Sequence, residues 1–212
     1  DNLPLGTEAC LSGTELLRQL HMRIENLRKS EKTNSDFHKF LDNEFVQVVE
    51  KTANRCQHQY KDANMDFSQE ISKAQQTLSV VDFGFHNMLQ HLDGSITYID
   101  FEYFGWDDPV KLVADTMQHP GINLDASARK LFFEKTLTIF GQDPEYLTRL
   151  KILYPLYGLR WCAIMLNEFL PGYKRISPKD FSIEEEQHLK LEKLNQVRIN
   201  LKNIQTYKKF MY

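Results

Sequence analysis

The sequence predicts a mainly α fold that carries one small β-hairpin. Apolar residues recur at helical spacing along most of the 212 residues, beginning with the stretch 13–29. The strongest hairpin signal is Asp93-Gly94, a dipeptide between two apolar runs that tolerates the positive φ values of a tight turn. A chain of this length can bury one substantial core. We therefore expect a helical domain with a hairpin near the middle of the chain.

The first half of the chain is expected to enter from a hinge and then form helices. Residues 1–12 have no strong period and are interpreted as the exit from a hinge. Helical spacing predicts a helix over 13–29. After a polar break, Ser35 or its neighbour caps a long helix, whose second half, 52–66, is polar and is expected to be exposed or broken. A further short helix is predicted over about 66–77.

Four helices are predicted after the hairpin, over about 109–118, 125–141, 143–172 and 182–212. Each one follows a start signal, namely Asp107 or Asp108 before Pro109, then Asp125, then Asp143-Pro144, and finally the capping box of Ser182 and Glu185. The third of these helices is the most apolar. Its residues 154–170 are interrupted by Arg160 and Glu168, which makes a buried helix a better interpretation than a membrane span.

Composition excludes some classes of function. The formal net charge is −3 and no basic stretch dominates the chain, so nucleic acid is not an expected partner. No membrane partner is expected either. The three cysteines are widely spaced and no signal peptide is recognisable, a pattern that is typical of a cytoplasmic protein.

Polar residues flank the predicted hairpin in a pattern that suits a hard metal ion. A two-residue turn centred on positions 93 and 94 sets Asn87 opposite Asp100, and opposed residues in a hairpin have Cβ atoms about 4.5–5.5 Å apart. An amide oxygen and a carboxylate so placed can share one Mg²⁺ ion. Asp82 precedes Asn87 by five residues, and Glu102 follows Asp100 in a D-x-E pair.

This order of residues resembles the catalytic segment of the kinase-like small-molecule phosphotransferases, the group of the aminoglycoside phosphotransferases and the choline/ethanolamine kinases. The residues IDFEY at 99–103 resemble the I-D-F/W-E segment of that family, and GWDDPVKLVA at 105–114 resembles the segment that follows it. The resemblance implies that residues 1–212 form the helical C-terminal lobe of a protein-kinase-like α+β fold. Residues 78–108 would hold its catalytic loop, hairpin and metal segment.

The resemblance also implies roles for these residues. Asp82 corresponds to the catalytic base, and Asn87 and Asp100 correspond to ligands of Mg²⁺. Glu102 would hold a second ion or orient water. ATP would be the phosphate donor, and the acceptor would be a hydroxyl of a small polar molecule, such as a sugar, an amino-sugar, choline or an aminoglycoside. Further candidates for contacts with the acceptor are His86, Trp106, Trp161 and Glu168. The carboxylates of Asp107, Asp108 and Glu168 would suit an amine or a polyhydroxyl compound.

The sequence departs from the family in three respects. Val80 replaces a usual His, and Lys111 stands where an Asp is common. No Gly-rich loop and no strand Lys followed by a helix Glu precede the first predicted helix, so the N-terminal nucleotide lobe is absent from this sequence. We expect the isolated chain to be inactive as a kinase.

Two other functions stay open. The chain can be a non-catalytic binding module descended from such a kinase, which Val80 and Lys111 favour. Alternatively, it can be a metal-dependent phosphohydrolase that directs Asp82, Asp100 and Glu102 at water.

Overall fold

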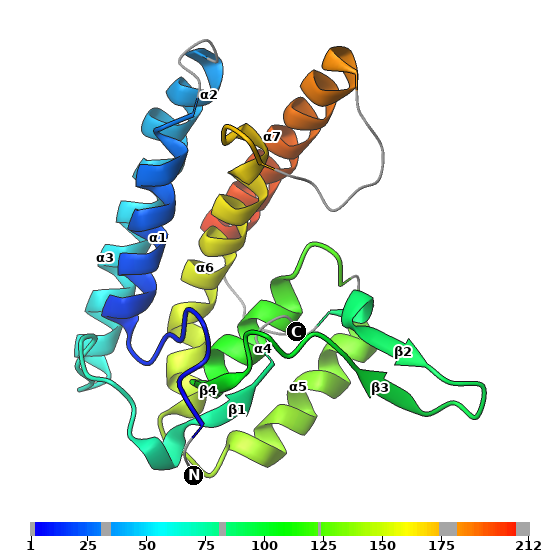
Figure 1. The fold of residues 1–212 in the computed structure, drawn as a ribbon. Coiled ribbons are helices and arrows are strands. Elements are labelled where there is room, and N and C mark those ends of the chain that lie inside the picture. The colour runs from blue at the N-terminus through cyan, green and yellow to red at the C-terminus, as the bar shows by residue number, and fades with distance from the viewer. Residues whose placement is uncertain (1–2, 31–34, 81–83, 123, 174–181, 207–212) are drawn as a thin grey trace.

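The computed structural model describes residues 3–30, 35–80, 84–122, 124–173 and 182–206. This part of the chain is mainly helical and contains two antiparallel sheets of two strands each (Figure 1), so the predicted class, mainly α with a small β-hairpin, is confirmed. The helices are α1 (Gly13–Leu27), α2 (Ser35–Phe40), α3 (Val46–Asp62), α4 (Pro109–Gln118), α5 (Ala126–Phe140), α6 (Tyr146–Met165) and α7 (Ile183–Thr206). Short helical turns are η1 (Leu41–Phe45), η2 (Lys73–Gln75), η3 (Phe85–Asn87) and η4 (Leu166–Phe169). The strands are β1 (Thr77–Ser79), β2 (Met88–Gln90), β3 (Ile96–Tyr98) and β4 (Gly105–Asp107).

Helix α6 is the centre of the fold and packs against α1, α3, α4 and α7. It is apolar around most of its circumference, as expected for a buried helix, and the side chains of Tyr146 and Tyr157 are fully buried. Figure 1 shows α1, α3, α6 and α7 side by side, with α4, α5 and the strands toward the other end of α6. The β2–β3 hairpin projects from this second part as an arm.

Most helix starts lie at the predicted caps. The carboxylates of Asp108 and Asp125 each accept a backbone N–H of the helix that follows, and Ser182 and Glu185 bond reciprocally as a capping box. The long helix after residue 35 is also confirmed, with the π-helical turn η1 within it. Its second half is not broken, because a narrow stripe that includes Cys56 and Tyr60 is buried.

The predicted helix over 66–77 is wrong. The carboxylate of Asp66 accepts hydrogen bonds from Ser68 N (2.8 Å) and Ser68 Oγ (2.7 Å), which closes a turn instead of starting a helix. Farther along, Ile71 N donates to Leu11 O at 2.9 Å. These bonds draw the segment against the N-terminal part of the chain, and only η2 and β1 form in it.

Strands β1 and β4 make a small sheet that the sequence did not predict. Ser79 pairs with Gly105, and the N-terminal segment adds a bridge from Leu5 to Trp106. A Cβ atom at Gly105 would lie 2.4 Å from Gly6 N, so only glycine allows the two backbones to approach this closely. Residues 4–6 are therefore part of the sheet edge.

The described helices include none that is both long and apolar enough to cross a membrane. The three cysteines are buried and unpaired. Burial raises the pKa of the Cys10 thiol to about 12, and that of Cys56 and Cys162 to about 12 as well, so none of them is a ready nucleophile at neutral pH.

Candidate functional site

Strands β2 and β3 form the predicted hairpin, but its turn has three residues instead of two. Met88 pairs with Tyr98. His91 N donates to Ser95 O at 2.9 Å, which leaves 92–94 as the loop. The predicted register is therefore wrong by one residue.

Local hydrogen bonds favour the longer turn. Asp93 Oδ1 accepts from Ser95 N at 2.9 Å and from Ser95 Oγ at 2.7 Å. Gly94 has a φ of +83°, which is the left-handed position of a three-residue hairpin loop, whereas Asp93 keeps a negative φ. The Asp-Gly pair marks the hairpin correctly, but the side chain of Asp93 bonds to the residue beyond the glycine and so lengthens the loop.

The register changes how the two predicted metal ligands are arranged. Ile99 N donates to Asn87 O at 2.9 Å, so the backbone neighbour of Asn87 is Ile99, and Asp100 lies one residue beyond it. The predicted direct opposition of Asn87 and Asp100 is wrong. Both residues nevertheless lie at the open end of the same hairpin, where the side chain of Asn87 is buried.

Asp100 has an unusual backbone conformation, with a φ of +65°. For a residue other than glycine, the left-handed region costs about 1–2 kcal/mol, although Asp tolerates it better than most. The chain turns at this point and closes a tight loop in which Phe104 N donates to Phe101 O at 3.0 Å. Strained positions cluster at functional sites, and this one presents an exposed carboxylate at the end of a hairpin.

The rest of the predicted site is described only in part. Asp82, the predicted base, lies outside the described residues. His86 belongs to η3, but its side chain is not among those that the structure describes. Glu102 is exposed in the loop after Asp100. Within the described parts of the chain, no three His, Cys, Asp or Glu side chains gather as a metal site.

Lys111 makes a fully buried ion pair. Its Nζ lies 2.7 Å from Asp107 Oδ2, and the two side chains are 1% and 0% exposed. The other oxygen of Asp107 accepts from Cys10 N and Asp108 N, both at 2.8 Å. This pair therefore joins the start of α4 to the N-terminal segment.

Asp108 is also a structural residue. Its carboxylate caps α4 and accepts two hydrogen bonds from Arg149, at 3.1 and 3.2 Å. Arg149 also donates to Asp143 at 2.8 Å. Burial raises the pKa of Asp108, against the opposing effect of the Arg149 charge. Because Asp107 and Asp108 are buried and fully engaged, neither is placed to contact an acceptor molecule.

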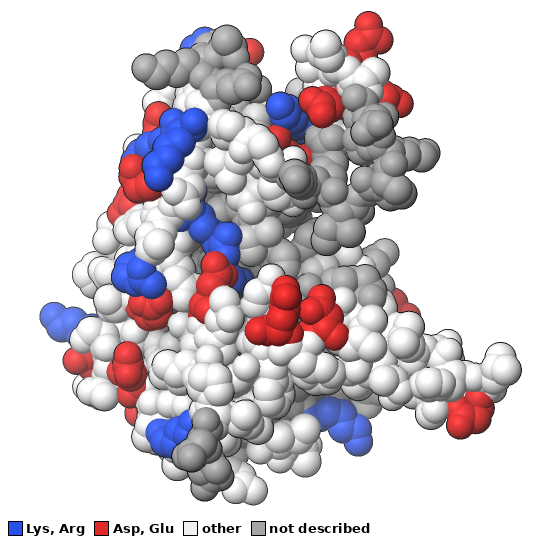
Figure 2. All heavy atoms as spheres, viewed as in Figure 1, with Lys and Arg blue, Asp and Glu red and all other residues white. Residues whose placement is uncertain are grey.

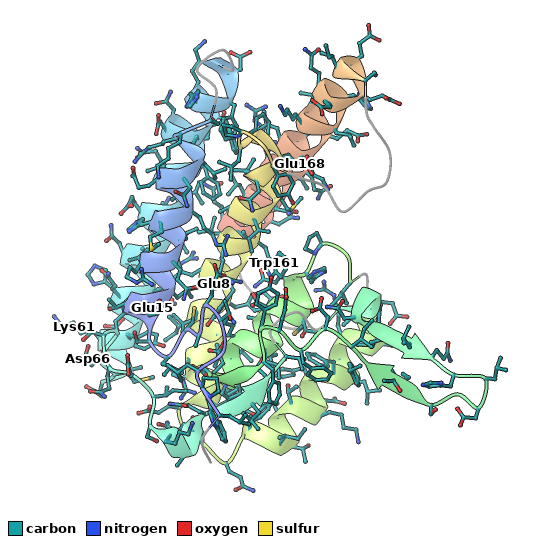
Figure 3. All side chains as sticks on the ribbon, in the orientation of Figure 1. Glu8, Glu15, Lys61, Asp66, Trp161 and Glu168 are labelled. Atoms are coloured by element: carbon teal, nitrogen blue, oxygen red, sulfur yellow. The ribbon has the colours of Figure 1, made fainter. Side chains whose placement is uncertain are left out.

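The structure does not bring together the three predicted acceptor residues whose side chains it describes, Trp106, Trp161 and Glu168. Trp106 lies in the β1–β4 sheet, where Lys73 Nζ is 3.6 Å from the centre of its ring system. Trp161 lies on α6, and its ring meets that of His119 edge-on, with 4.5 Å between the ring centres. Figure 3 shows Glu168 farther along, at η4, while Trp161 lies closer to Glu8.

A cavity of about 380 Å³ lies beside Trp161. Its walls come from the N-terminal segment, α1, α4, α6 and the loop after Asp100, and include Glu8, Arg23, Tyr103, Asp115, Arg160 and Trp161. Figure 2, which has the same view as Figure 1, shows acidic and basic groups next to one another near the middle of the visible surface. The sequence had indicated Tyr103, as part of an aromatic run that could line a pocket, and Arg160 and Trp161, as polar positions of a buried helix, but it gave no signal for Glu8, Arg23 or Asp115.

No family model, no curated protein and no solved structure matches this chain. The kinase-like interpretation therefore depends on the residues themselves.

Proposed function

We propose that this chain carries the metal-binding and acceptor-binding part of an ATP- and Mg²⁺-dependent phosphotransferase that acts on a hydroxyl of a small polar molecule. The observation that carries the proposal is the left-handed Asp100, which follows the backbone pair of Ile99 and Asn87 at the open end of the hairpin. A left-handed, exposed Asp at the open end of a hairpin is a conformation that a binding site explains better than packing does.

The candidate ligands fit Mg²⁺. Asn87, Asp100 and Glu102 offer oxygen donors only, which is the preference of a hard cation. When bound, Mg²⁺ would neutralise charge on the transferred phosphoryl group. In the same proposal, Asp82 accepts the proton of the acceptor hydroxyl or aims that hydroxyl at the phosphate. Since the sequence contains no Gly-rich phosphate loop, the isolated chain is expected to bind the metal without turning over ATP.

Metal binding tests this proposal directly. The binding of Mn²⁺, as a paramagnetic substitute for Mg²⁺, would be measured on the wild type, on Asp100→Asn and on Asp62→Asn, an exposed carboxylate at the end of α3. We expect Asp100→Asn to weaken binding at least about tenfold, a loss of about 1.4 kcal/mol, and Asp62→Asn to have no effect. Equal binding by the two variants would refute the proposal and favour a non-catalytic module.

An ATP assay separates the remaining alternatives. Incubation of the chain with ATP and Mg²⁺ is expected to yield neither a phosphorylated acceptor nor inorganic phosphate. Release of phosphate without an acceptor would favour the phosphohydrolase. Phosphorylation of an acceptor that Asp82→Ala abolishes would show that the isolated chain is active after all.

A further inference from the structure

We propose that the cavity beside Trp161 binds the phosphate acceptor, and that the acceptor is an uncharged polyhydroxyl compound of the sugar or sugar-alcohol type. The inference rests on the proposed function, since it names the acceptor of the same reaction. The cavity volume of about 380 Å³ is that of a small-molecule site.

The charged side chains of the cavity wall neutralise one another. Arg160 donates to Glu8 at 2.7 Å and to Asp115 at 3.2 and 3.3 Å. Arg23 donates to both oxygens of Glu8, at 2.5 and 2.6 Å. Two arginines thus face two carboxylates, and the formal charges sum to zero. A charged ligand would have to separate one of these pairs, at a cost that a neutral ligand avoids.

The histidine of the wall adds no charge. His119 Nδ1 accepts a hydrogen bond from Gly121 N at 2.9 Å, so this nitrogen carries no proton and the ring is neutral. Glu8, in turn, is a carboxylate: burial alone would raise its pKa, but the charges and hydrogen bonds of Arg160 and Arg23 lower it overall. Burial raises the pKa of Asp115, the other carboxylate of the wall, against the opposing charge of Arg160, which donates to both of its oxygens.

Hydroxyl groups fit such a wall because each one can both donate and accept. The carboxylate oxygens offer acceptors to a ligand. Donors in the same wall are the guanidinium groups of Arg23 and Arg160 and the indole N–H of Trp161, which also lies within hydrogen-bond reach of Asp115.

Aromatic side chains complete the site. Trp161 and Tyr103 both line the cavity, and the electron-rich face of an aromatic ring suits the C–H face of a sugar ring. Tyr103 also connects the cavity to the proposed metal site, because it directly follows Glu102, and its carbonyl accepts from Thr7 N at 3.3 Å. An acceptor bound here would lie beside the loop that begins at Asp100.

The two tryptophans of the chain provide a test. In Trp106→Phe, Trp161 becomes the sole tryptophan and reports on the cavity by fluorescence. We expect D-glucose or myo-inositol to shift this fluorescence, while choline, a cation, and gluconate, an anion, do not at equal concentration. Binding of either charged compound as tightly as the better polyol would overturn the inference, as would the absence of binding by both polyols.

Calorimetry on variants distinguishes a binding site from a structural effect. Trp161→Leu is expected to weaken polyol binding at least about tenfold, whereas Trp161→Phe, which keeps an aromatic face, and Trp106→Phe retain most of it. Equal affinity in Trp161→Leu and the wild type would overturn the inference. Asp100→Asn should leave polyol binding unchanged. Polyol binding with no metal site would refute the proposed function alone, and metal binding without polyol binding would refute only this inference.

Discussion

Replacing Lys111 by methionine tests the most deeply buried ion pair of the described structure. The change removes the ammonium that lies 2.7 Å from Asp107, while the two side chains are 1% and 0% exposed. Removal of one partner of a buried pair costs about 3–5 kcal/mol, because the other charge is left uncompensated. Asp107 keeps two hydrogen bonds from backbone donors at 2.8 Å, those of Cys10 and Asp108. We therefore expect the free energy of unfolding to fall by about 3 kcal/mol, the lower end of that range.

The loss would be measured as the free energy of unfolding in urea. For a domain of this size, about 3 kcal/mol corresponds to a fall of about 6–12 °C in Tm. Adding Asp107→Asn should recover at least half of the loss, because the amide oxygen still accepts the backbone bonds and no charge remains buried. Lys39→Met, in an exposed pair with Asp36, is the matched control and should change stability little. If Lys111→Met is as stable as Lys39→Met, the buried pair does not hold the start of α4 to the N-terminal segment.

Three further changes probe the same framework. Arg149→Met leaves the buried Asp108 without its cation, and urea unfolding should show a loss of about 3–5 kcal/mol; wild-type stability would contradict this. Burial alone would raise the pKa of Asp143, but hydrogen bonds from Arg149 and a backbone N–H, with the Arg149 charge, lower it overall. The ionised Asp143 therefore stabilises the folded protein fully above its unfolded pKa of about 3.9, and this contribution is lost as the pH falls below that value. Asp143→Asn should accordingly lower the free energy of unfolding at pH 7 and have little effect near pH 2. Gly105→Ala should lower Tm more than Gly94→Ala, because a Cβ atom at Gly105 would collide with the backbone of Gly6. At Gly94 the change only strains a residue with positive φ, at a cost of about 1 kcal/mol. Equal decreases in Tm would refute the close approach of the backbones at Gly105 and Gly6.

Local sequence signals predicted most helices of this protein correctly. The caps Asp108, Asp125 and Ser182 bond to groups within three residues of themselves, so their effect does not depend on the rest of the fold. The Asp93-Gly94 pair located the hairpin for the same reason. Its register was predicted wrongly because two turns of different length compete at this pair, and the bond from Ser95 to Asp93 decides between them.

Contacts between distant residues decided the rest. Residues 77–79 are extended because residues 105–107 pair with them. The predicted helix over 66–77 does not form, because Asp66 bonds to Ser68 and Ile71 bonds to the distant Leu11. The candidate site, too, could be predicted from the sequence only in part. The order of Asn87, Asp100 and Glu102 could be recognised in the sequence, but the left-handed turn at Asp100 could not.

The sequence by itself determined where the helices begin, where the hairpin lies and which oxygen donors are candidates for a metal ion, because these features depend on near neighbours in the chain. Only the tertiary structure decided that a charge-balanced cavity exists. Glu8 and Arg160 are 152 residues apart in the sequence, and no local rule links two such residues. The packing of α6 against α1 brings Arg160 near Arg23, and Glu8, in the segment before α1, bonds to both arginines. Burial of these charges would be costly without such partners.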